Sequence, residues 1–206
     1  MRRFILFATV LLIANLPASA QTSYPSVEVS GGYSYMNAKV VDRDSLHGWG
    51  AGIAGNLSAN WGFAAEFSGH YGNVKTPNST FEFPPLPPIT LPGIKLSTSK
   101  YLFLFGPRFS VRGDKLTGFA HVLVGGAKTN LKSSFRDVGI IGFPLNVPSS
   151  TASETGFAMA IGGGVDVNVG KNFALRVLQV DYVPERLGGQ WQHNVRAQFG
   201  IVFKID

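Results

Sequence analysis

Hydrophobic residues alternate with small, polar or charged residues along most of this chain. The alternation is clearest at 155–169, where Phe157 and Ile161 share one parity while glycines, alanines and Asp166 share the other. A period of two places successive side chains on opposite faces of a β-strand. The chain is therefore predicted to be all-β, with one face of each strand against an apolar environment.

Eight segments follow this pattern, and the connections between them alternate in length. The predicted strands cover about 26–37, 47–57, 61–73, 100–112, 116–129, 155–169, 175–182 and 193–205, and the long loops cover 38–46, 74–98, 130–154 and 184–192. This layout is typical of an eight-stranded antiparallel up-and-down transmembrane β-barrel inserted into a bacterial outer membrane from one side. The even strand count places both termini at the end with the short turns, which is periplasmic in such barrels.

Two local irregularities are predicted within the strands. Pro107 has no N–H to donate to a ladder, so we expect a bulge there. The alternation of outward-facing residues also shifts by one position near Leu178, between Val177 and Val180. A one-residue bulge would explain that slip, because a bulge adds one unpaired residue to one strand.

The first twenty residues have the features of a secretory signal peptide. Arg2 and Arg3 precede an apolar run at 4–16, Pro17 ends it, and Ala18-Ser19-Ala20 is a small-residue cleavage site. We therefore expect residues 1–20 to be removed and residues 21–206 to form the barrel domain; an uncleaved anchor would need a longer apolar run. No later stretch approaches ~20 continuous apolar residues, so a membrane-spanning form must be a closed barrel.

Composition agrees with a barrel and excludes some partners. The formal charge is +6, but Lys and Arg form no runs, so no nucleic-acid partner is expected. There are no cysteines, and barrel closure is the expected alternative source of stability. Aromatic residues are predicted to form two girdles at the membrane interfaces. The periplasmic girdle contains Trp61, Phe109, Phe173 and Phe203, and the outer girdle contains Tyr35, Trp49, Tyr71, Tyr101, Phe157 and Tyr182.

Charged residues on the inward parity are predicted to fill the lumen. They are Glu28, Glu66, Arg108, Arg112, Asp166, Arg176, Asp181 and Arg196. Isolated buried charges are costly, so these groups should pair across the lumen and block ions. Inward glycines such as Gly50 and Gly162 raise the alternative of a water-filled gap.

The last strand carries a second informative pattern. In 198–205, Gln198 and Gly200 are followed by the alternating hydrophobic residues Phe203 and Ile205. This segment and the eight-strand layout resemble the small OmpA/OmpX-type outer-membrane barrels and their C-terminal insertion signal, although Asp206 follows where that family usually ends on an aromatic residue. The resemblance covers the whole mature chain. It implies outer-membrane lipid and the outer-membrane assembly machinery as partners.

No catalytic or cofactor chemistry is indicated. Some eight-stranded outer-membrane barrels are lipid A deacylases or acyltransferases, in which a nucleophilic Ser works with His and a carboxylate. None of the four histidines has a serine two residues later. His70 and His121 face the predicted lumen, where hydrogen bonding within a polar network is the expected role. We predict no enzyme activity, no cofactor and no metal site.

Two of the long loops are unusually apolar. The segments 81–92 and 138–145 are rich in Phe, Pro, Leu and Ile. They are expected either to pack on each other as a cap or to offer a surface to a partner or an apolar solute at 74–98 and 130–154. The predicted function is a structural or surface-interaction role with a closed lumen. The alternatives are a narrow transport barrel for small or hydrophobic solutes and a soluble, lipocalin-like barrel, although the latter would need the opposite polarity of its two faces.

Overall fold

The structure is a computed structural model, and it describes residues 24–38, 44–75, 79–83, 86–91, 94–135, 138–140, 143–145 and 150–206. The predicted signal peptide lies outside these residues. Within them, no helix is long and apolar enough to cross a membrane.

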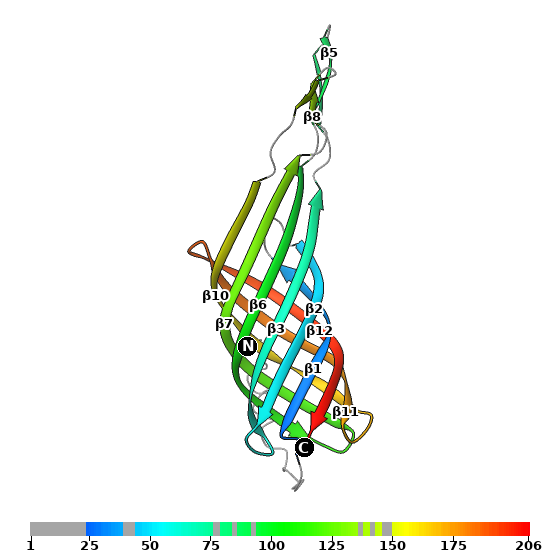
Figure 1. Cartoon of the computed structure of the whole chain (residues 1–206), viewed down its shortest axis with the longest axis vertical. Helices are drawn as coiled ribbons and strands as arrows, with labels where there is room; N and C mark the ends of the chain where they lie inside the picture. Colours follow the sequence, from blue (N-terminus) through cyan, green and yellow to red (C-terminus); the bar gives the residue numbers. More distant parts are fainter. Residues whose placement is uncertain are drawn as a thin grey trace, which may run out of the picture.

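Eight long strands of the described chain close into a single antiparallel barrel, in the order β1-β12-β11-β10-β7-β6-β3-β2 (Figure 1). The strands are β1 (Val27–Ala38), β2 (Asp44–Asn56), β3 (Trp61–Lys75), β6 (Ile94–Arg112), β7 (Leu116–Phe135), β10 (Ser150–Asn168), β11 (Phe173–Leu187) and β12 (Gln190–Ile205). This confirms the predicted fold class. Closure occurs between the first and last strands, where Val27 pairs with Ile205.

The three short turns lie at the same end of the barrel as this closure. Backbone bonds from Ser58 to Trp61, Gly113 to Leu116 and Gly170 to Phe173 close them, at 3.0, 2.8 and 3.1 Å. Following the sequence prediction, we refer to this end as periplasmic and to the opposite end as outer.

The predicted parity is confirmed on all eight strands. Outward apolar residues remain exposed on the isolated molecule, such as Phe63 at 57% and Phe203 at 50%, while inward residues on the same strands are buried. Cross-strand aromatic pairs mark both girdles: Trp61 with Phe109 at the periplasmic end and Tyr71 with Tyr101 at the outer end, with ring centroids 5.0 and 5.9 Å apart. An apolar exterior of this kind faces lipid.

One predicted irregularity is present and the other is wrong. The pairing of β11 shifts between Arg176 and Gln179, which leaves Val177 and Leu178 both exposed, as a one-residue bulge requires. At Pro107 the pairing between β6 and β7 keeps the same register on both sides, from Phe105 with Val124 to Arg108 with His121. Pro107 thus lacks the N–H for one ladder hydrogen bond, but no extra residue is inserted beside it. On its other side β6 stays paired with β3, where Pro107 lies opposite Phe63.

The outer connections are shorter than predicted. β6 begins at Ile94, β7 continues to Phe135 and β10 begins at Ser150, so the predicted loops 74–98 and 130–154 are partly strand. The predicted loop 184–192 is a tight turn at Gly188 and Gly189, whose φ values of 55° and 80° suit a two-residue hairpin. These segments escaped prediction because they lie beyond the lipid, where strands no longer need an apolar face.

One part of the barrel wall projects beyond the rest at the outer end (Figure 1). The projecting sheet consists of the outer parts of β3, β6, β7 and β10. Residues 150–156 of β10 have ladder partners on β7 alone among the described residues, so this strand has a free edge there. Two small hairpins, β4 (Ser79–Phe83) with β5 (Leu86–Leu91) and β8 (Val138–Ile140) with β9 (Phe143–Leu145), lie at the far tip, where β5 approaches β8. Whether the apolar loop segments form a cap or a partner surface stays a prediction, since their side chains lie outside what the structure describes.

Candidate functional site

The structure places all eight predicted lumen charges inside the barrel and connects them to one another. Together with Lys100 and Glu185, they make five carboxylates and five cations within the described lumen, and the half-buried Lys204 adds one more inward cation at the periplasmic mouth. The buried charge is therefore balanced without counting the two histidines. A balanced network avoids the large cost of an isolated buried ion.

The layer nearest the periplasmic end is built around Glu28 on β1. Arg108 and Arg112, both on β6, reach across the lumen to its two carboxylate oxygens at 2.8 and 2.9 Å. Beside them, Arg176 donates two hydrogen bonds to Asp166, at 2.9 and 3.1 Å. The contacts to Glu28 join strands across the lumen, whereas the bidentate contact of Arg176 with Asp166 joins the neighbouring strands β11 and β10.

Phe119 fills the space between two of these arginines. The guanidinium carbons of Arg108 and Arg176 lie 4.3 and 4.5 Å from its ring centroid. Cations over an aromatic face are attracted to its negative potential. This inward phenylalanine therefore contributes to the charged layer as well as filling volume.

The middle layer is centred on Arg196 of β12, whose side chain is fully buried. It donates to Asp181 on the neighbouring β11 at 2.7 and 3.0 Å, and it contacts Glu66 on β3 across the lumen. Gln179 donates to both carboxylates, at 3.0 Å to Glu66 and 2.9 Å to Asp181. His121 adds a 2.8 Å contact to Asp181. Each carboxylate thus has several partners, which is what buried ion pairs require to be tolerated.

A third charged pair lies further toward the outer end and was missed by sequence reasoning. Lys100 on β6 and Glu185 on β11 are fully buried and 2.8 Å apart, and Asn194 donates to the same carboxylate at 2.8 Å. Lys100 shares the inward parity of Arg108, so the alternation could have placed it. Glu185 could not have been placed, because it was assigned to a loop.

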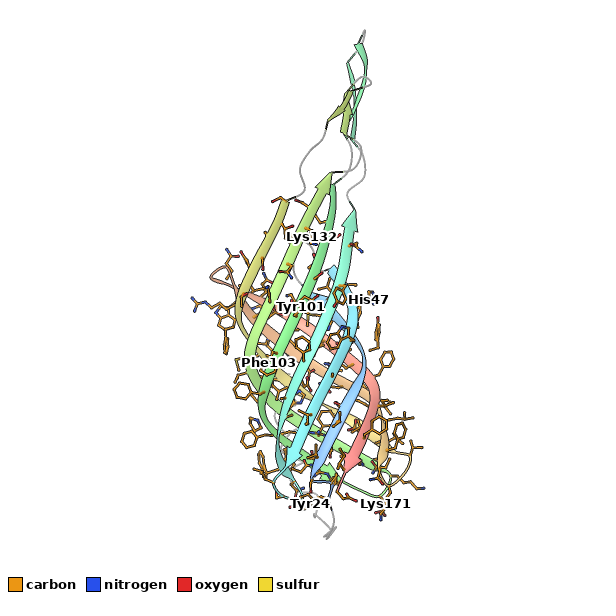
Figure 2. The ribbon with its side chains drawn as sticks, in the orientation of Figure 1. Tyr24, His47, Tyr101, Phe103, Lys132 and Lys171 are labelled. Carbon is orange, nitrogen blue, oxygen red and sulfur yellow. The ribbon has the colours of Figure 1, made fainter. Side chains whose placement is uncertain are left out.

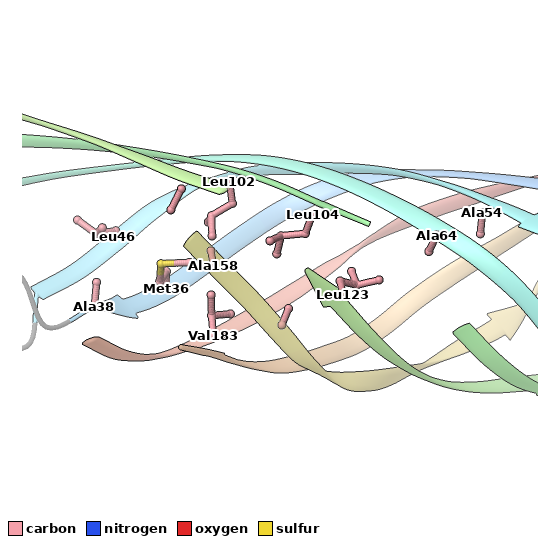
Figure 3. Close-up of a cluster of buried hydrophobic side chains, with 12 residues drawn as sticks. Met36, Ala38, Leu46, Ala54, Ala64, Leu102, Leu104, Leu123, Ala158 and Val183 are labelled. Atoms are coloured by element: carbon pink, nitrogen blue, oxygen red, sulfur yellow. The ribbon is translucent and has the colours of Figure 1, made fainter. Parts of the chain in front are cut away.

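A cluster of hydrophobic side chains is also buried in the lumen (Figure 3). Buried hydrophobic side chains from most of the strands meet there, and sequence reasoning did not anticipate this apolar layer. Its larger members are Met36, Leu46, Leu102, Leu104, Leu123 and Val183. Closely packed side chains leave little room for water. The described lumen is therefore filled by charged layers toward the periplasmic end and, toward the outer end, mainly by apolar side chains with the buried pair of Lys100 and Glu185.

The inward glycines do not leave an open channel at their own positions. A Cβ added at Gly50 would lie 2.4 Å from the Gln198 side chain, and one at Gly162 would lie 2.3 Å from the Asp181 carboxylate. The Gln198 side chain occupies the space at Gly50, and the backbone of Val180 and the carboxylate of Asp181 occupy the space at Gly162. Two lumen cavities lined by Ser30 and Arg176 measure about 10 Å³ each, which is room for about one water molecule. A wider vestibule of about 340 Å³ lies at the periplasmic mouth, next to Arg112 and Thr117.

One cluster has ligand atoms placed as a metal site would need them. Oxygen or nitrogen atoms of Glu66, His121 and Asp181 all lie within 4.8 Å of one another. The guanidinium of Arg196 already contacts both carboxylates, and a divalent cation would add positive charge to a balanced lumen. The residues therefore fit an ion-pair network better than a metal centre.

A serine and a histidine also meet in the lumen. The Oγ of Ser34 lies 2.7 Å from Nε2 of His70, and both residues are fully buried. Within the part of the chain that the structure describes, Nδ1 of His70 has no hydrogen-bond partner, so no carboxylate orients the ring. A triad needs that third group and access for substrate. The absence of enzyme activity stays a prediction.

Comparison with protein families decides what kind of barrel this is. The family described as "Outer membrane protein beta-barrel domain" matches residues 6–201. The chain belongs to this family. Membership places the barrel in the bacterial outer membrane and excludes the soluble, lipocalin-like alternative. Cleavage of the signal peptide stays a prediction.

Several solved structures are similar to this chain. Two structures of Ail, the attachment invasion locus protein of Yersinia pestis, one of them in complex with the heparin analogue sucrose octasulfate, superpose with TM-scores of 0.56 and 0.55. Each is 18% identical to this chain and covers 88% of it and 100% of Ail. Neisserial surface protein A (NspA) is 12% identical, with a TM-score of 0.46, over 87% of this chain and 97% of that one. No curated protein matches the sequence. At these identities the similarity shows the fold alone.

The predicted insertion signal lies on the strand that closes the barrel. Phe203 and Ile205 point outward and pair with Val29 and Val27 on β1. Gln198 and Gly200 point inward. Recognition of these residues by the assembly machinery stays a prediction.

Proposed function

We propose that this protein is a closed outer-membrane barrel with a structural or surface-interaction role, which it performs outside its lumen. The observation that carries the proposal is the set of ion pairs bridging opposite strands, Arg108 with Glu28, Arg196 with Glu66 and Lys100 with Glu185. Solutes would have to break these pairs and also displace the apolar layer above them. Side chains are able to fill the interior of an eight-stranded barrel.

The projecting sheet supports a role at the cell surface. Its free edge at residues 150–156 of β10 presents backbone N–H and C=O groups that have no partner strand on that side among the described residues. Free edges are able to accept an added strand from another chain. The barrel would then hold this sheet at a fixed orientation above the membrane.

A narrow transport barrel is the competing function. The apolar layer favours it in one respect, because residues such as Met36, Leu102 and Val183 would suit a hydrophobic solute entering from outside. The charged layers beneath would oppose the passage of such a solute. The two functions therefore differ in what they predict for permeability.

Vesicle permeability distinguishes the two functions. Purified protein is reconstituted into phosphatidylcholine vesicles, and swelling is followed in isotonic arabinose or glycine, with a general porin as positive control. We expect the rate of swelling to equal that of protein-free vesicles, because the lumen is filled. Swelling that exceeds this background and decreases with solute size would support the transport function instead.

A further inference from the structure

Three basic side chains lie on the outward face of the barrel at its outer boundary. Lys128 and Lys132 on β7 and Arg186 on β11 are exposed and point away from the lumen. Figure 2 shows Lys132 on the outer side of Tyr101, with Phe103 lying further toward the periplasmic end. We call these three residues the basic face. They lie where the apolar exterior ends.

The strand pairing joins the basic face directly to the outer aromatic girdle. Lys128 pairs with Tyr101 on one side and Thr155 on the other. Arg186 pairs with Phe157 on one side and Trp191 on the other. Phe157 and Trp191 are 45% and 51% exposed. Aromatic residues of this kind lie at the level of lipid headgroups.

The register also brings two of the cations toward one point. β7 and β11 flank β10, so Lys128 and Arg186 are separated by two strand spacings, which is roughly 10 Å across the strands. They are also offset by two residues, which is roughly 7 Å along the strands. The exposed hydroxyl of Thr155 lies between them, beside Lys128 and two residues from Phe157. Long, flexible Lys and Arg side chains are able to converge on one anion over such a span.

Nothing on the described exterior neutralises this charge. The outward positions of β6, β7, β10, β11 and β12 that the structure describes carry no carboxylate. The nearest acids in sequence are Glu185, which pairs with Lys100 in the lumen, and Glu154, which has the inward parity and is exposed beside Gly188 without an ion pair to the basic face among the described residues. At the periplasmic end, by contrast, the exposed residues Lys115 and Lys171 are accompanied by Asp114 and Asp206. Among the described residues, the exposed lysines of the periplasmic end therefore have acids near them in the sequence, whereas the basic face has none on the outward positions of these strands.

We propose that the basic face binds the phosphate group of a lipid in the outer leaflet, held between Lys128 and Arg186 over Thr155, with Lys132 adding to the positive potential. Arg and Lys supply charge-assisted hydrogen bonds to phosphate oxygens, and Thr155 supplies a further donor. The acyl chains of the same lipid would lie against Phe157 and the apolar exterior below it. This inference does not depend on whether the lumen is closed.

The test compares lipids that differ only in phosphate. The native protein in mild detergent is mixed with diphosphoryl lipid A or with lipid A freed of its phosphates, and retained lipid is measured by native mass spectrometry. We expect at least about tenfold tighter retention of the phosphorylated lipid, which corresponds to about 1.4 kcal/mol. The triple variant Lys128→Gln, Lys132→Gln, Arg186→Gln should lose this preference. The matched variant Lys115→Gln, Lys171→Gln should keep it.

Three results would overturn the proposal. Equal retention of the two lipids by the native protein would show that phosphate is not recognised. An unchanged preference in the triple variant would place the site elsewhere. Complete displacement of the lipid by inorganic pyrophosphate would mean that the face recognises a soluble anion rather than a lipid. Because all three side chains are exposed, the triple variant is expected to fold, which its heat-modifiable gel mobility verifies.

Discussion

Replacing Arg196 with Met should destabilise the barrel more than any other single change to the lumen. The substitution leaves Glu66 and Asp181 buried without the cation that contacts both of them. Gln179 and His121 remain as partners and offset only part of the loss. Breaking a buried ion pair by removing one partner costs about 3–5 kcal/mol. We expect the free energy of unfolding to fall by about that amount, measured by urea unfolding in phosphatidylcholine vesicles with tryptophan fluorescence.

A matched control separates the loss of the ion pairs from the loss of an arginine. Arg186→Met makes the same substitution at an exposed position, where we expect a change of about 0.5 kcal/mol or less. Adding Glu66→Gln and Asp181→Asn to Arg196→Met should restore much of the lost stability, because no carboxylate is then left buried in the middle layer without its cation. Similar losses for Arg196→Met and Arg186→Met would show that the network contributes little to stability.

Replacing Phe203 with Asp should remove most of the protein from the outer membrane. Phe203 points into lipid on the closing strand and packs on Phe173, with ring centroids 5.4 Å apart. Near the periplasmic rim, the direct cost of an exposed acid is about 1 kcal/mol or less, so energy alone would not prevent insertion. The larger effect should come from loss of recognition by the assembly machinery. Immunoblotting of fractionated membranes measures the outcome.

Phe63→Asp is the control for this prediction. Phe63 is also an exposed outward aromatic residue, but it lies on β3 rather than on the closing strand. Both variants should refold into pure lipid vesicles to a similar extent, while only Phe203→Asp should fail in cells. Equal losses of the two variants in cells, or normal levels of Phe203→Asp, would refute a signal at this position.

The alternation of residues was enough to predict the strands, their number and the direction of their side chains. Arg108, Asp166 and Arg196 could be placed in the lumen because a period of two leaves a strand residue only two faces. Which charges pair could not be predicted in this way. Arg108 meets Glu28 and Arg196 meets Glu66 across the lumen, and such contacts depend on the stagger of the closed barrel.

The outer part of the molecule was harder to predict for a different reason. Glu185 lies on a strand segment at the outer end that was predicted to be a loop, because the sequence there lacks the regular apolar alternation that lipid imposes. The apolar layer was missed because inward Leu102 and Leu104 flank outward Phe103, so the segment reads as uniformly apolar. At Pro107 a bulge was predicted from the missing N–H alone, whereas the pairing with Phe63 on β3 holds the register.

Ion conductance in a planar lipid bilayer tests the central claim, a lumen closed by its own side chains, most directly. The native protein should show no steady conductance above that of the bare bilayer, because the charged and apolar layers fill the interior. Arg108→Ala, which removes the cation between Glu28 and Asp166, should raise any residual conductance. Large, steady, porin-like conductance from the native protein would contradict a closed lumen.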